Sequence, residues 1–361
     1  MGTPIVHALE AHHYTDPARF AREQACVFAR TWQYVGHVSQ IERPGDYFCF
    51  ELHGRSLFCV RNDDGNVGTF YNVCAHRAHR LVEGSGNKRV LVCPYHAWTY
   101  RLDGGLRNAP GAERVAGFDR DAICLTTVRN EIVAGFIFVN LDDSAAAFDA
   151  WYPGLAGALE EYLPDLSRLR PVYTREVEEQ CNWKVSVENY SECYHCRRNH
   201  PTFSSGVVDP DSYDIVAEGH MLHHVTQSAA PEALSYKVDP DSHPRALDYS
   251  SWFLWPTFSF QVYPGNVLNT YQWHAVDHRS TRVIRQWFAR DGVESDTLSR
   301  LAEQDLGSTV AEDIRIVESV QRGLESGGYR PGPLVIDPSG GVNSEHSIRT
   351  LYAWLEEATG A

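Results

Sequence analysis

The sequence predicts an α+β protein in which an all-β region is followed by a region of mixed helices and strands. Between residues 40 and 145, short segments rich in β-branched and aromatic residues alternate with turn signals such as Asp63–Asp64–Gly65, as is typical of all-β domains. From residue 171 onward, segments of strand character are interspersed with segments of helical periodicity. The 361 residues are sufficient for two domains of ordinary size or one large domain.

Hydrophobic periodicity predicts where the main elements lie. Helices are expected over residues 14–35, where Asp16 and Pro17 open the periodic run, over residues 145–170, and over Val310–Leu324. Strands are expected over the following segments: Tyr47–Leu52, Ser56–Arg61, Val90–Val92, Ile132–Asn140, Trp252–Tyr263 and Val267–Ala275.

The composition argues against several classes of partner. A formal charge of −15 and a pI of about 5.5 disfavour binding to nucleic acid or anionic lipid. The N-terminal residues do not resemble a secretory signal, and the most apolar stretch, Ile132–Leu141, is too short to span a bilayer. We therefore expect a soluble cytoplasmic protein without a membrane partner. The nine cysteines do not form a disulfide framework, so we expect free thiols or metal ligands.

Two cysteine–histidine pairs form the first candidate site. Cys74 and His76 are separated by one residue, Cys93 and His96 by two, and each pair follows a predicted strand. Tetrahedral zinc is one interpretation, but zinc sites usually take like ligands from each half of the motif. A Rieske [2Fe–2S] cluster needs the mixture seen here, because two thiolates bind one iron and two imidazoles bind the other. We therefore prefer a cluster held by these four residues.

The segment 182–201 forms the second candidate site. If this segment is helical, Glu188, Glu192 and His195 fall on one face at spacings of four and three residues. The proline after His200 disfavours helical backbone at that histidine, so the helix should end there and let the His200 side chain turn back. An isolated histidine is more often a core or surface residue, but two histidines beside acids suit a divalent metal.

The predicted helix over Val310–Leu324 offers a third ligand. Its apolar residues recur at helical spacing, and Asp313 is the one acid on that stripe, whereas Glu312 lies outside it. A buried aspartate is costly unless it is paired or bound to metal. Asp313 is therefore preferred over Glu312 as the carboxylate that completes the site.

Both candidate sites resemble those of the Rieske non-haem iron oxygenase family, in its α (oxygenase) subunits. CAHRAHR at 74–80 with CPYHAW at 93–98 is similar to the family's cluster motif, and NWKVSVENYSECYHCRRNHP at 182–201 is similar to its iron motif. Ala78 and Ala97 stand where the family often has glycine, so a small local difference in the backbone is expected. The resemblance covers nearly the whole chain.

The resemblance implies a fold and a domain organisation. It implies an N-terminal all-β Rieske domain and a C-terminal helix-grip catalytic domain, in which an antiparallel sheet wraps around a helix. The expected boundaries are 1–38 for an N-terminal helical segment that packs on the catalytic domain, 39–150 for the Rieske [2Fe–2S] domain, and 151–361 for the catalytic mononuclear iron domain.

The resemblance also implies roles for individual residues. His195, His200 and Asp313 would bind iron as a 2-His-1-carboxylate triad with open positions for O₂. Glu192 would bridge His195 and His96 of the partner subunit in a homotrimer, and would orient both imidazoles. The sequence contains no Gly-rich dinucleotide motif, so a separate flavin/iron–sulfur reductase is expected to deliver electrons from NAD(P)H.

The setting of Glu192 indicates a class of substrate. Its E-C-Y-H-C context resembles the branch that acts on carnitine, choline and betaines, where hydroxylation beside nitrogen leads to N-demethylation or C–N cleavage. Asn189 is expected to line the substrate pocket. Aromatic residues gather between 252 and 273, and aromatic faces bind quaternary ammonium groups by cation–π attraction, although such residues also pack ordinary cores.

Three alternatives stay open from the sequence. The first is an aromatic-ring oxygenase of the same family. The second is a Rieske electron carrier without catalysis, and the third is a zinc-stabilised binding protein. An iron count separates an oxygenase of either kind from a carrier, because an oxygenase should hold three irons per chain and a carrier two, and a zinc protein should be colourless.

Overall fold

The computed structural model describes residues 5–226, 232, 234 and 236–360, and these fall into two compact units. Unit 1 comprises residues up to Val27 together with those from Ala146 onward, and unit 2 comprises Phe28–Ala145. The sequence places the corresponding boundaries at 38/39 and 150/151. The first edge lies earlier in the structure because β1 (Gln33–His37) pairs with β10 (Phe136–Asn140) inside unit 2.

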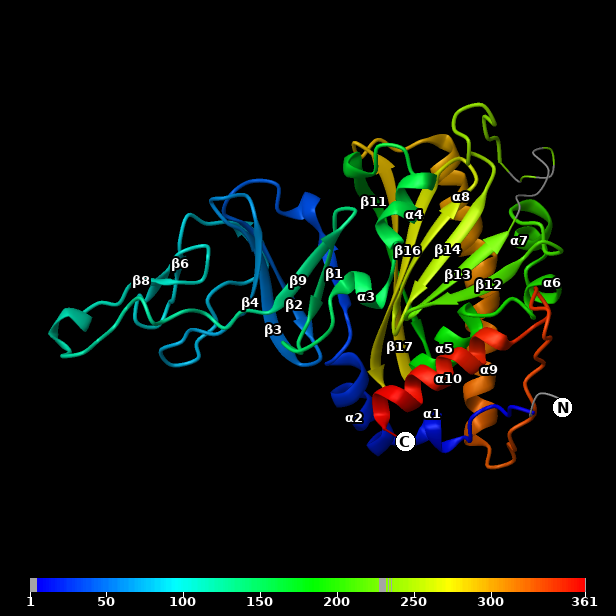
Figure 1. Cartoon of the computed structure of the whole chain (residues 1–361), viewed down its shortest axis with the longest axis horizontal. Coiled ribbons are helices and arrows are strands. Elements are labelled where there is room, and N and C mark those ends of the chain that lie inside the picture. Colours follow the sequence, from blue (N-terminus) through cyan, green and yellow to red (C-terminus); the bar gives the residue numbers. More distant parts are fainter. Residues whose placement is uncertain (1–4, 227–231, 233, 235, 361) are drawn as a thin grey trace. The chain divides into compact units, whose positions relative to one another are not determined.

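Unit 2 is built from antiparallel sheets, as expected for the all-β region (Figure 1). Their strand orders are β4-β3-β2-β5, β1-β10-β9 and β6-β7-β8. The remaining elements of this unit are β2 (Asp46–Leu52), β3 (Arg55–Arg61), β4 (Val67–Tyr71), β5 (Ser85–Asn87), β6 (Leu91–Val92), β7 (Thr99–Tyr100), β8 (Leu106–Asn108), β9 (Arg129–Val133), and the 3₁₀ turns η2 (Val38–Gln40) and η3 (Ala112–Arg114).

One predicted strand of unit 2 is two strands in the structure. The segment Ile132–Asn140 turns at Ala134 and Gly135, whose φ angles are 55° and 90°, and continues as β10, which pairs with β9. Glycine adopts such a backbone readily, and alanine adopts it at a cost. The alternation of apolar residues alone does not reveal this turn.

Unit 1 contains a seven-stranded antiparallel sheet in the order β11-β17-β16-β15-β14-β13-β12 within the described residues. The strands are β11 (Leu169–Glu179), β12 (Asp214–Glu218), β13 (Met221–Thr226), β14 (Tyr249–Leu254), β15 (Phe258–Tyr263), β16 (Val267–Asp277) and β17 (Ser280–Arg290). β14 and β15 are buried along their whole lengths, so both faces of the sheet are covered there. This confirms the predicted α+β fold with an antiparallel sheet around helices.

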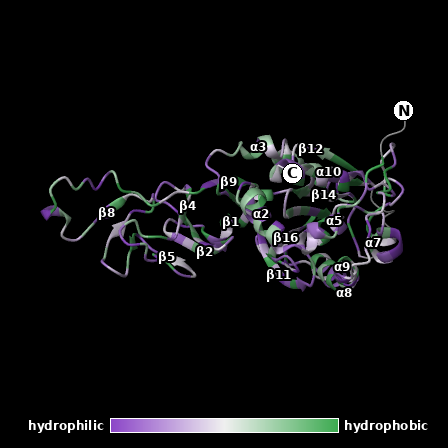
Figure 2. Ribbon diagram, turned by 90° about the horizontal axis from the view of Figure 1, so that it is seen from below, coloured by the Kyte–Doolittle hydropathy of each residue, from purple (hydrophilic) through white to green (hydrophobic). Residues whose placement is uncertain are grey.

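Helices cover the sheet and supply the candidate site. They are α1 (His12–Thr15), α2 (Pro17–Glu23), α3 (Phe148–Trp151), α4 (Leu155–Tyr162), α5 (Trp183–Tyr190), α6 (Cys196–Asn199), α7 (Pro201–Gly206), α8 (Asp296–Gly307), α9 (Thr309–Glu325) and α10 (His346–Thr359), with π turn η1 (Gln24–Phe28) and 3₁₀ turn η4 (Leu166–Arg168). α5 packs on β16, β17 and α9 (Figure 1). Figure 2 shows both hydrophobic and hydrophilic residues at α9, and its buried residues Val310, Val317 and Leu324 recur at helical spacing, as expected of an amphipathic helix.

Two helical predictions need correction. The helix expected over 14–35 is shorter, because η1 ends at Phe28 and the chain then enters β1; its predicted start is confirmed, since Asp16 Oδ1 accepts a hydrogen bond of 2.8 Å from Ala18 N. The helical region expected over 145–170 is divided among α3, α4 and η4, and β11 already begins at Leu169. No helix among the described residues is both long and apolar enough to cross a membrane.

Candidate metal and substrate site

The two cysteine–histidine loops of unit 2 have matching backbones. The backbone carbonyl of Cys74 accepts a hydrogen bond from Ala78 N (2.9 Å), and the carbonyl of Cys93 accepts the equivalent bond from Ala97 N (3.0 Å). Ala78 and Ala97 both adopt left-handed backbone, with φ angles of 60° and 57°. Their methyl groups are therefore accommodated in the conformation that glycine favours, at a cost in free energy.

The side chains of these loops gather in an arrangement that suits a Rieske cluster. The Cys74 and Cys93 thiols are buried and close enough to hydrogen bond, and Cys74 Sγ lies 3.1 Å from the hydroxyl of Tyr100. The His76 and His96 rings are exposed, with centroids 4.8 Å apart. The buried thiolates and exposed imidazoles reproduce the two-sided ligand set of such a cluster.

In unit 1, His195, His200 and Asp313 converge at one point. His195 Nε2 lies 3.0 Å from His200 Nε2, and Asp313 Oδ1 lies 3.0 Å from His200 Nε2 and 3.7 Å from His195 Nε2. Donors at right angles on a metal with bonds of about 2.1 Å are about 3 Å apart. Asp313 Oδ1 is buried and has no hydrogen-bond partner among the described residues, so this triad fits a metal ion.

The other ring nitrogen of each histidine is held by a glutamate. Glu192 hydrogen bonds to His195 Nδ1, and Glu312 Oε2 lies 2.8 Å from His200 Nδ1. These contacts direct both Nε2 atoms toward Asp313 and fix the imidazole tautomers, as carboxylates commonly do for metal-bound histidines. The sequence placed Glu312 outside the apolar stripe and gave it no role. The sequence signal for this role was the position of Glu312 directly before Asp313.

The segment 182–201 is not one helix, so that prediction is wrong. α5 ends at Tyr190, and α6 begins only at Cys196. The Glu192 carboxylate interrupts the helix because it accepts hydrogen bonds from the backbone N–H groups of Tyr194 and His195. The break directs the His195 side chain toward His200.

The two cysteines that flank His195 form a disulfide that the sequence did not predict. Cys193 and Cys196 form a disulfide, whereas the sequence predicted that all cysteines are free thiols or metal ligands. Their Cα atoms lie 4.9 Å apart across the turn, which is within the range that a disulfide requires. The other seven cysteines are free in the structure.

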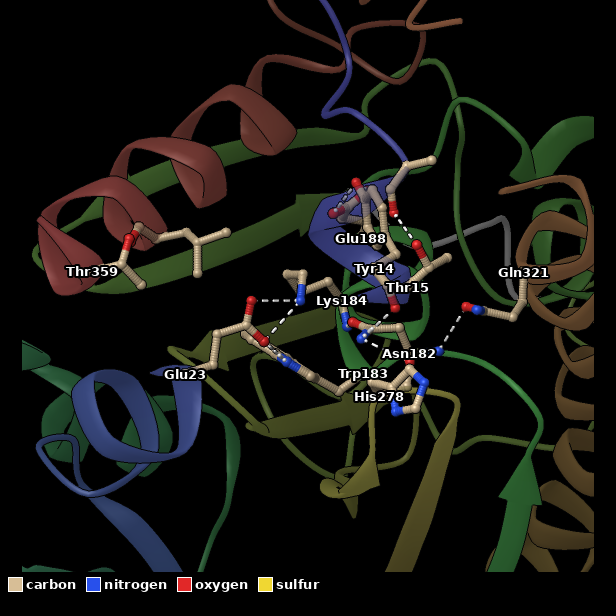
Figure 3. Close-up of polar contacts among 12 residues, drawn as sticks. Tyr14, Thr15, Glu23, Asn182, Trp183, Lys184, Glu188, His278, Gln321 and Thr359 are labelled. Carbon is tan, nitrogen blue, oxygen red and sulfur yellow. Dashed lines mark hydrogen bonds and ion pairs between the residues drawn. The ribbon is translucent and has the colours of Figure 1, made fainter. Parts of the chain in front are cut away.

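Glu188 does not join the metal site, contrary to the single-helix prediction. Its carboxylate accepts hydrogen bonds of 2.8 and 3.0 Å from the Tyr14 hydroxyl on α1. Burial raises the pKa of Glu188 to about 7. Figure 3 shows Tyr14 and Glu188 next to each other, close to Lys184. Glu188 therefore ties the N-terminal helix to α5.

The Asn-Trp-Lys run before Glu188 anchors α5 (Figure 3). Asn182 Oδ1 caps the helix by accepting from Lys184 N at 3.0 Å. Glu23 is completely buried and accepts from Lys184 Nζ at 2.7 Å and from Trp183 Nε1 at 2.8 Å. These contacts position α5, which carries Asn189 beside the metal site, where Asn189 Nδ2 lies 3.5 Å from His195 Nε2.

A cavity opens directly onto the triad of His195, His200 and Asp313. We call it the active-site cavity; its wall includes His195, His200, Asp313, Asn189 and Glu192. Its aromatic residues are Tyr190, Phe203, Tyr213, Tyr249, Tyr263, Tyr271 and Trp273. Of the aromatic residues that the sequence singled out, Tyr263, Tyr271 and Trp273 line the cavity, whereas Trp252, Phe253, Trp255, Phe258 and Phe260 are buried elsewhere in unit 1.

Comparisons with known families decide the assignment. Residues 31–119 match the Rieske [2Fe-2S] domain, and residues 166–361 match the catalytic domain of the ring hydroxylating alpha subunit. The chain belongs to the Rieske oxygenase α-subunit family. Its cofactors are accordingly a Rieske [2Fe–2S] cluster and a mononuclear iron, which confirms the prediction from the two motifs.

The similar proteins are oxygenase subunits. The chain is 36% identical over 353 residues to the carnitine monooxygenase oxygenase subunit of Escherichia coli (strain K12), covering 97% of this chain and 93% of that protein. It is 29% identical to the glycine betaine monooxygenase oxygenase subunit of Chromohalobacter salexigens, covering 91% and 81%. Choline monooxygenase of Spinacia oleracea is also 29% identical, covering 97% and 78%.

Solved structures agree with the fold of this oxygenase. The quaternary ammonium Rieske monooxygenase CntA in complex with L-carnitine superposes with a TM-score of 0.84 at 31% identity, covering 98% of this chain and 96% of that one. A naphthalene 1,2-dioxygenase reaches a TM-score of 0.77 at 20% identity, covering 98% and 93%, and this likeness concerns the fold alone.

Proposed function

We propose that this oxygenase hydroxylates a small quaternary ammonium compound, such as carnitine, a betaine or choline, at a C–H bond next to nitrogen. A separate flavin/iron–sulfur reductase supplies the electrons from NAD(P)H. The observation that carries the proposal is the junction of the His195, His200 and Asp313 triad with an aromatic-lined cavity. The similarity to carnitine, glycine betaine and choline monooxygenases supports the same class of substrate.

The aromatic wall suits the cationic end of such a substrate. The ring centroids of Tyr190, Tyr271 and Trp273 lie 4.9 to 5.4 Å from one another, and all three line the cavity. Aromatic faces attract quaternary ammonium groups, which have no N–H to donate. Glu179, another buried residue of the wall, adds a carboxylate, and burial raises its pKa to about 7. A bound cation would favour its ionised form.

The proposed ligands follow the geometry of each site. His195, His200 and Asp313 would hold the iron, which when bound supplies O₂ activation, and Cys74, His76, Cys93 and His96 would hold the cluster. Glu192 and Glu312 keep the imidazoles of the iron ligands in orientation, and Asn189 lines the cavity beside them.

The overall reaction needs one O₂, two electrons and two protons for each C–H bond hydroxylated, and it releases one water. A hydroxyl group on a carbon attached to a quaternary nitrogen leaves a compound that breaks its C–N bond. Hydroxylation of an N-methyl group would therefore release formaldehyde and a tertiary amine. Hydroxylation of the longer chain at the carbon next to nitrogen would release trimethylamine and a proton and leave that carbon as an aldehyde.

We also propose a homotrimer in which Glu192 contacts His96 of the partner subunit. The Glu192 carboxylate already holds His195 Nδ1, so it could orient a second imidazole with its remaining lone pairs. The solved structure of a quaternary ammonium Rieske monooxygenase is described as revealing inter-subunit electron transfer, which supports the same arrangement here.

Metal and sulfide analysis with an absorption spectrum tests the assignment of cofactor ligands. Anaerobically purified wild type should contain three irons and two sulfides per chain, and His195→Ala should contain two irons while it keeps its red-brown colour. Two irons in both proteins would contradict the mononuclear site. O₂ uptake with carnitine, betaines and choline, in the presence of a reductase, then tests the substrate class; uptake only with aromatic rings would contradict it.

A further inference from the structure

Arg285 places a fully buried guanidinium in the wall of the active-site cavity. It belongs to β17, is opposite Tyr271 of β16 in the sheet, and has a relative exposure of 0%. The cavity wall that contains Arg285 also contains His195, His200 and Asp313. Among the described residues that line this cavity, Arg285 is the one lysine or arginine, so it supplies the fixed positive charge of the wall.

The contacts of Arg285 leave part of its guanidinium without partners. Asp305 of α8, itself 4% exposed, forms an ion pair with Arg285 Nη2. The Tyr271 ring covers the guanidinium at 3.9 Å from Cζ, and it offers no hydrogen-bond acceptor there. Nε and Nη1 have no hydrogen-bond partner among the described residues. A charged donor buried without an acceptor is costly, so these two donors favour an acceptor that enters the cavity.

The cavity wall also carries a buried acid, Glu179. Glu179 of β11 pairs with Thr281 of β17, four residues before Arg285, so the backbone positions of Glu179 and Arg285 are separated by roughly 13 Å along the strands. Asp313 of the triad is close enough to interact electrostatically with both Glu179 and Asp305. The wall of the cavity therefore carries a buried carboxylate and a buried guanidinium at separate positions along the sheet.

We propose that Arg285 binds an anionic group of the substrate, so that the preferred substrate is a quaternary ammonium compound that also carries a carboxylate. This inference rests on the proposed function and deepens it. The carboxylate accepts charge-assisted hydrogen bonds from Nε or Nη1, and the ammonium group faces the aromatic rings and Glu179. Asp305 is a positioning residue, because it holds Nη2 and leaves Nε and Nη1 without a hydrogen-bond partner among the described residues.

Calorimetric binding to the full-length holoprotein tests the inference without turnover, because no reductase is present. The probes are γ-butyrobetaine and its alcohol analogue 4-(trimethylammonio)butan-1-ol, which share their length and their cationic end. We expect the carboxylate compound to bind wild type on the order of tenfold to a hundredfold more tightly, as one charge-assisted hydrogen bond implies. Equal affinities would overturn the inference and leave the proposed function intact. If neither compound binds, the proposed function itself fails.

Variants assign the preference to Arg285. The double variant Arg285→Met with Asp305→Leu removes both charges together, which avoids the large cost of one unpaired buried charge. The preference for γ-butyrobetaine should fall to within about threefold, while the alcohol analogue binds as it does to wild type. Arg285→Lys should keep part of the preference. Arg282→Met, on an exposed position of the same strand, should keep all of it. A full preference in the double variant would overturn the inference.

Discussion

His200 and Glu312 are joined by a hydrogen bond of 2.8 Å between Nδ1 and Oε2, and this bond links α9 to the end of α6. The next residue of α9, Asp313, faces the opposite nitrogen of the same imidazole at 3.0 Å. Two consecutive acids of one helix therefore act on the two nitrogens of one histidine. One holds the ring, and the other is placed to share a metal with it.

Removal of Glu312 should weaken metal binding. Glu312→Ala leaves Nδ1 of His200 without its carboxylate, so we expect the apparent affinity for Fe(II) to fall about 10- to 100-fold. Anaerobic titration of the metal-depleted protein with Fe(II) measures this. Glu312→Gln should recover part of the loss, because its amide oxygen can still accept from Nδ1. Glu303→Gln, an exposed position on α8, is the matched control, and unchanged affinity in Glu312→Ala would contradict the assigned role.

Ala97→Gly and Ala78→Gly should each stabilise unit 2. Both alanines have left-handed backbone, which costs an L-residue about 1–2 kcal/mol, whereas glycine adopts it freely and loses about 0.4–1 kcal/mol through the unfolded chain. The net gain should be about 0.5–1 kcal/mol in the free energy of unfolding, read from denaturation of the cluster-loaded protein. Ala75→Gly, in the same loop but outside the left-handed region, should instead destabilise it.

The fold and the convergence of His195, His200 and Asp313 were predictable because local patterns carry them. Strand-like alternation of residues predicted the sheet-rich organisation. The proline after His200 predicted that the side chain of His200 turns back toward His195, and the two imidazoles do meet. Asp313 was found because a single acid interrupted an apolar stripe on α9. That stripe was only partly right, since Val320 is 45% exposed while Gln321, outside the stripe, is buried.

The contacts that were missed join residues far apart in the chain. Glu23 meets Lys184, and Asp305 meets Arg285, and neither pair has a sequence spacing that predicts it. The break after Tyr190 was missed because helix periodicity does not register a side chain that takes over backbone donors, as Glu192 does. Charged residues inside otherwise apolar segments were the available signal, because such residues are buried only with a partner or a ligand.

The Glu188→Gln variant should gain unfolding free energy relative to wild type as pH rises. Burial holds the pKa of Glu188 at about 7, above its value near 4.5 in the unfolded chain. Protonated Glu188 therefore contributes stability that is complete below about pH 4.5 and is lost as pH rises through 7. Glutamine does not titrate, so between pH 5 and pH 8.5 the variant should gain roughly 3 kcal/mol relative to wild type.

Denaturation of both proteins across that pH range measures the difference. The glutamine side chain in Glu188→Gln keeps an amide oxygen for the Tyr14 hydroxyl, so the hydrogen bond that links α1 to α5 can persist in the variant. Glu356→Gln, exposed on α10, should show no such trend. A constant difference between Glu188→Gln and wild type at all pH values would contradict the prediction.

A single variant of the Glu23–Lys184 pair should cost more stability than the pair contributes as a unit. Lys184→Met leaves a completely buried carboxylate without its cation, which should cost about 3–5 kcal/mol of unfolding free energy. Adding Glu23→Gln removes that charge and keeps an oxygen acceptor for Trp183 Nε1, so the double variant should be more stable than Lys184→Met alone. Chemical denaturation of all four proteins completes the double-mutant cycle. If the losses of unfolding free energy in the two single variants add up to the loss in the double variant, the two charges do not interact. The packing of Trp183 would then be the contact that fixes α5 to α2.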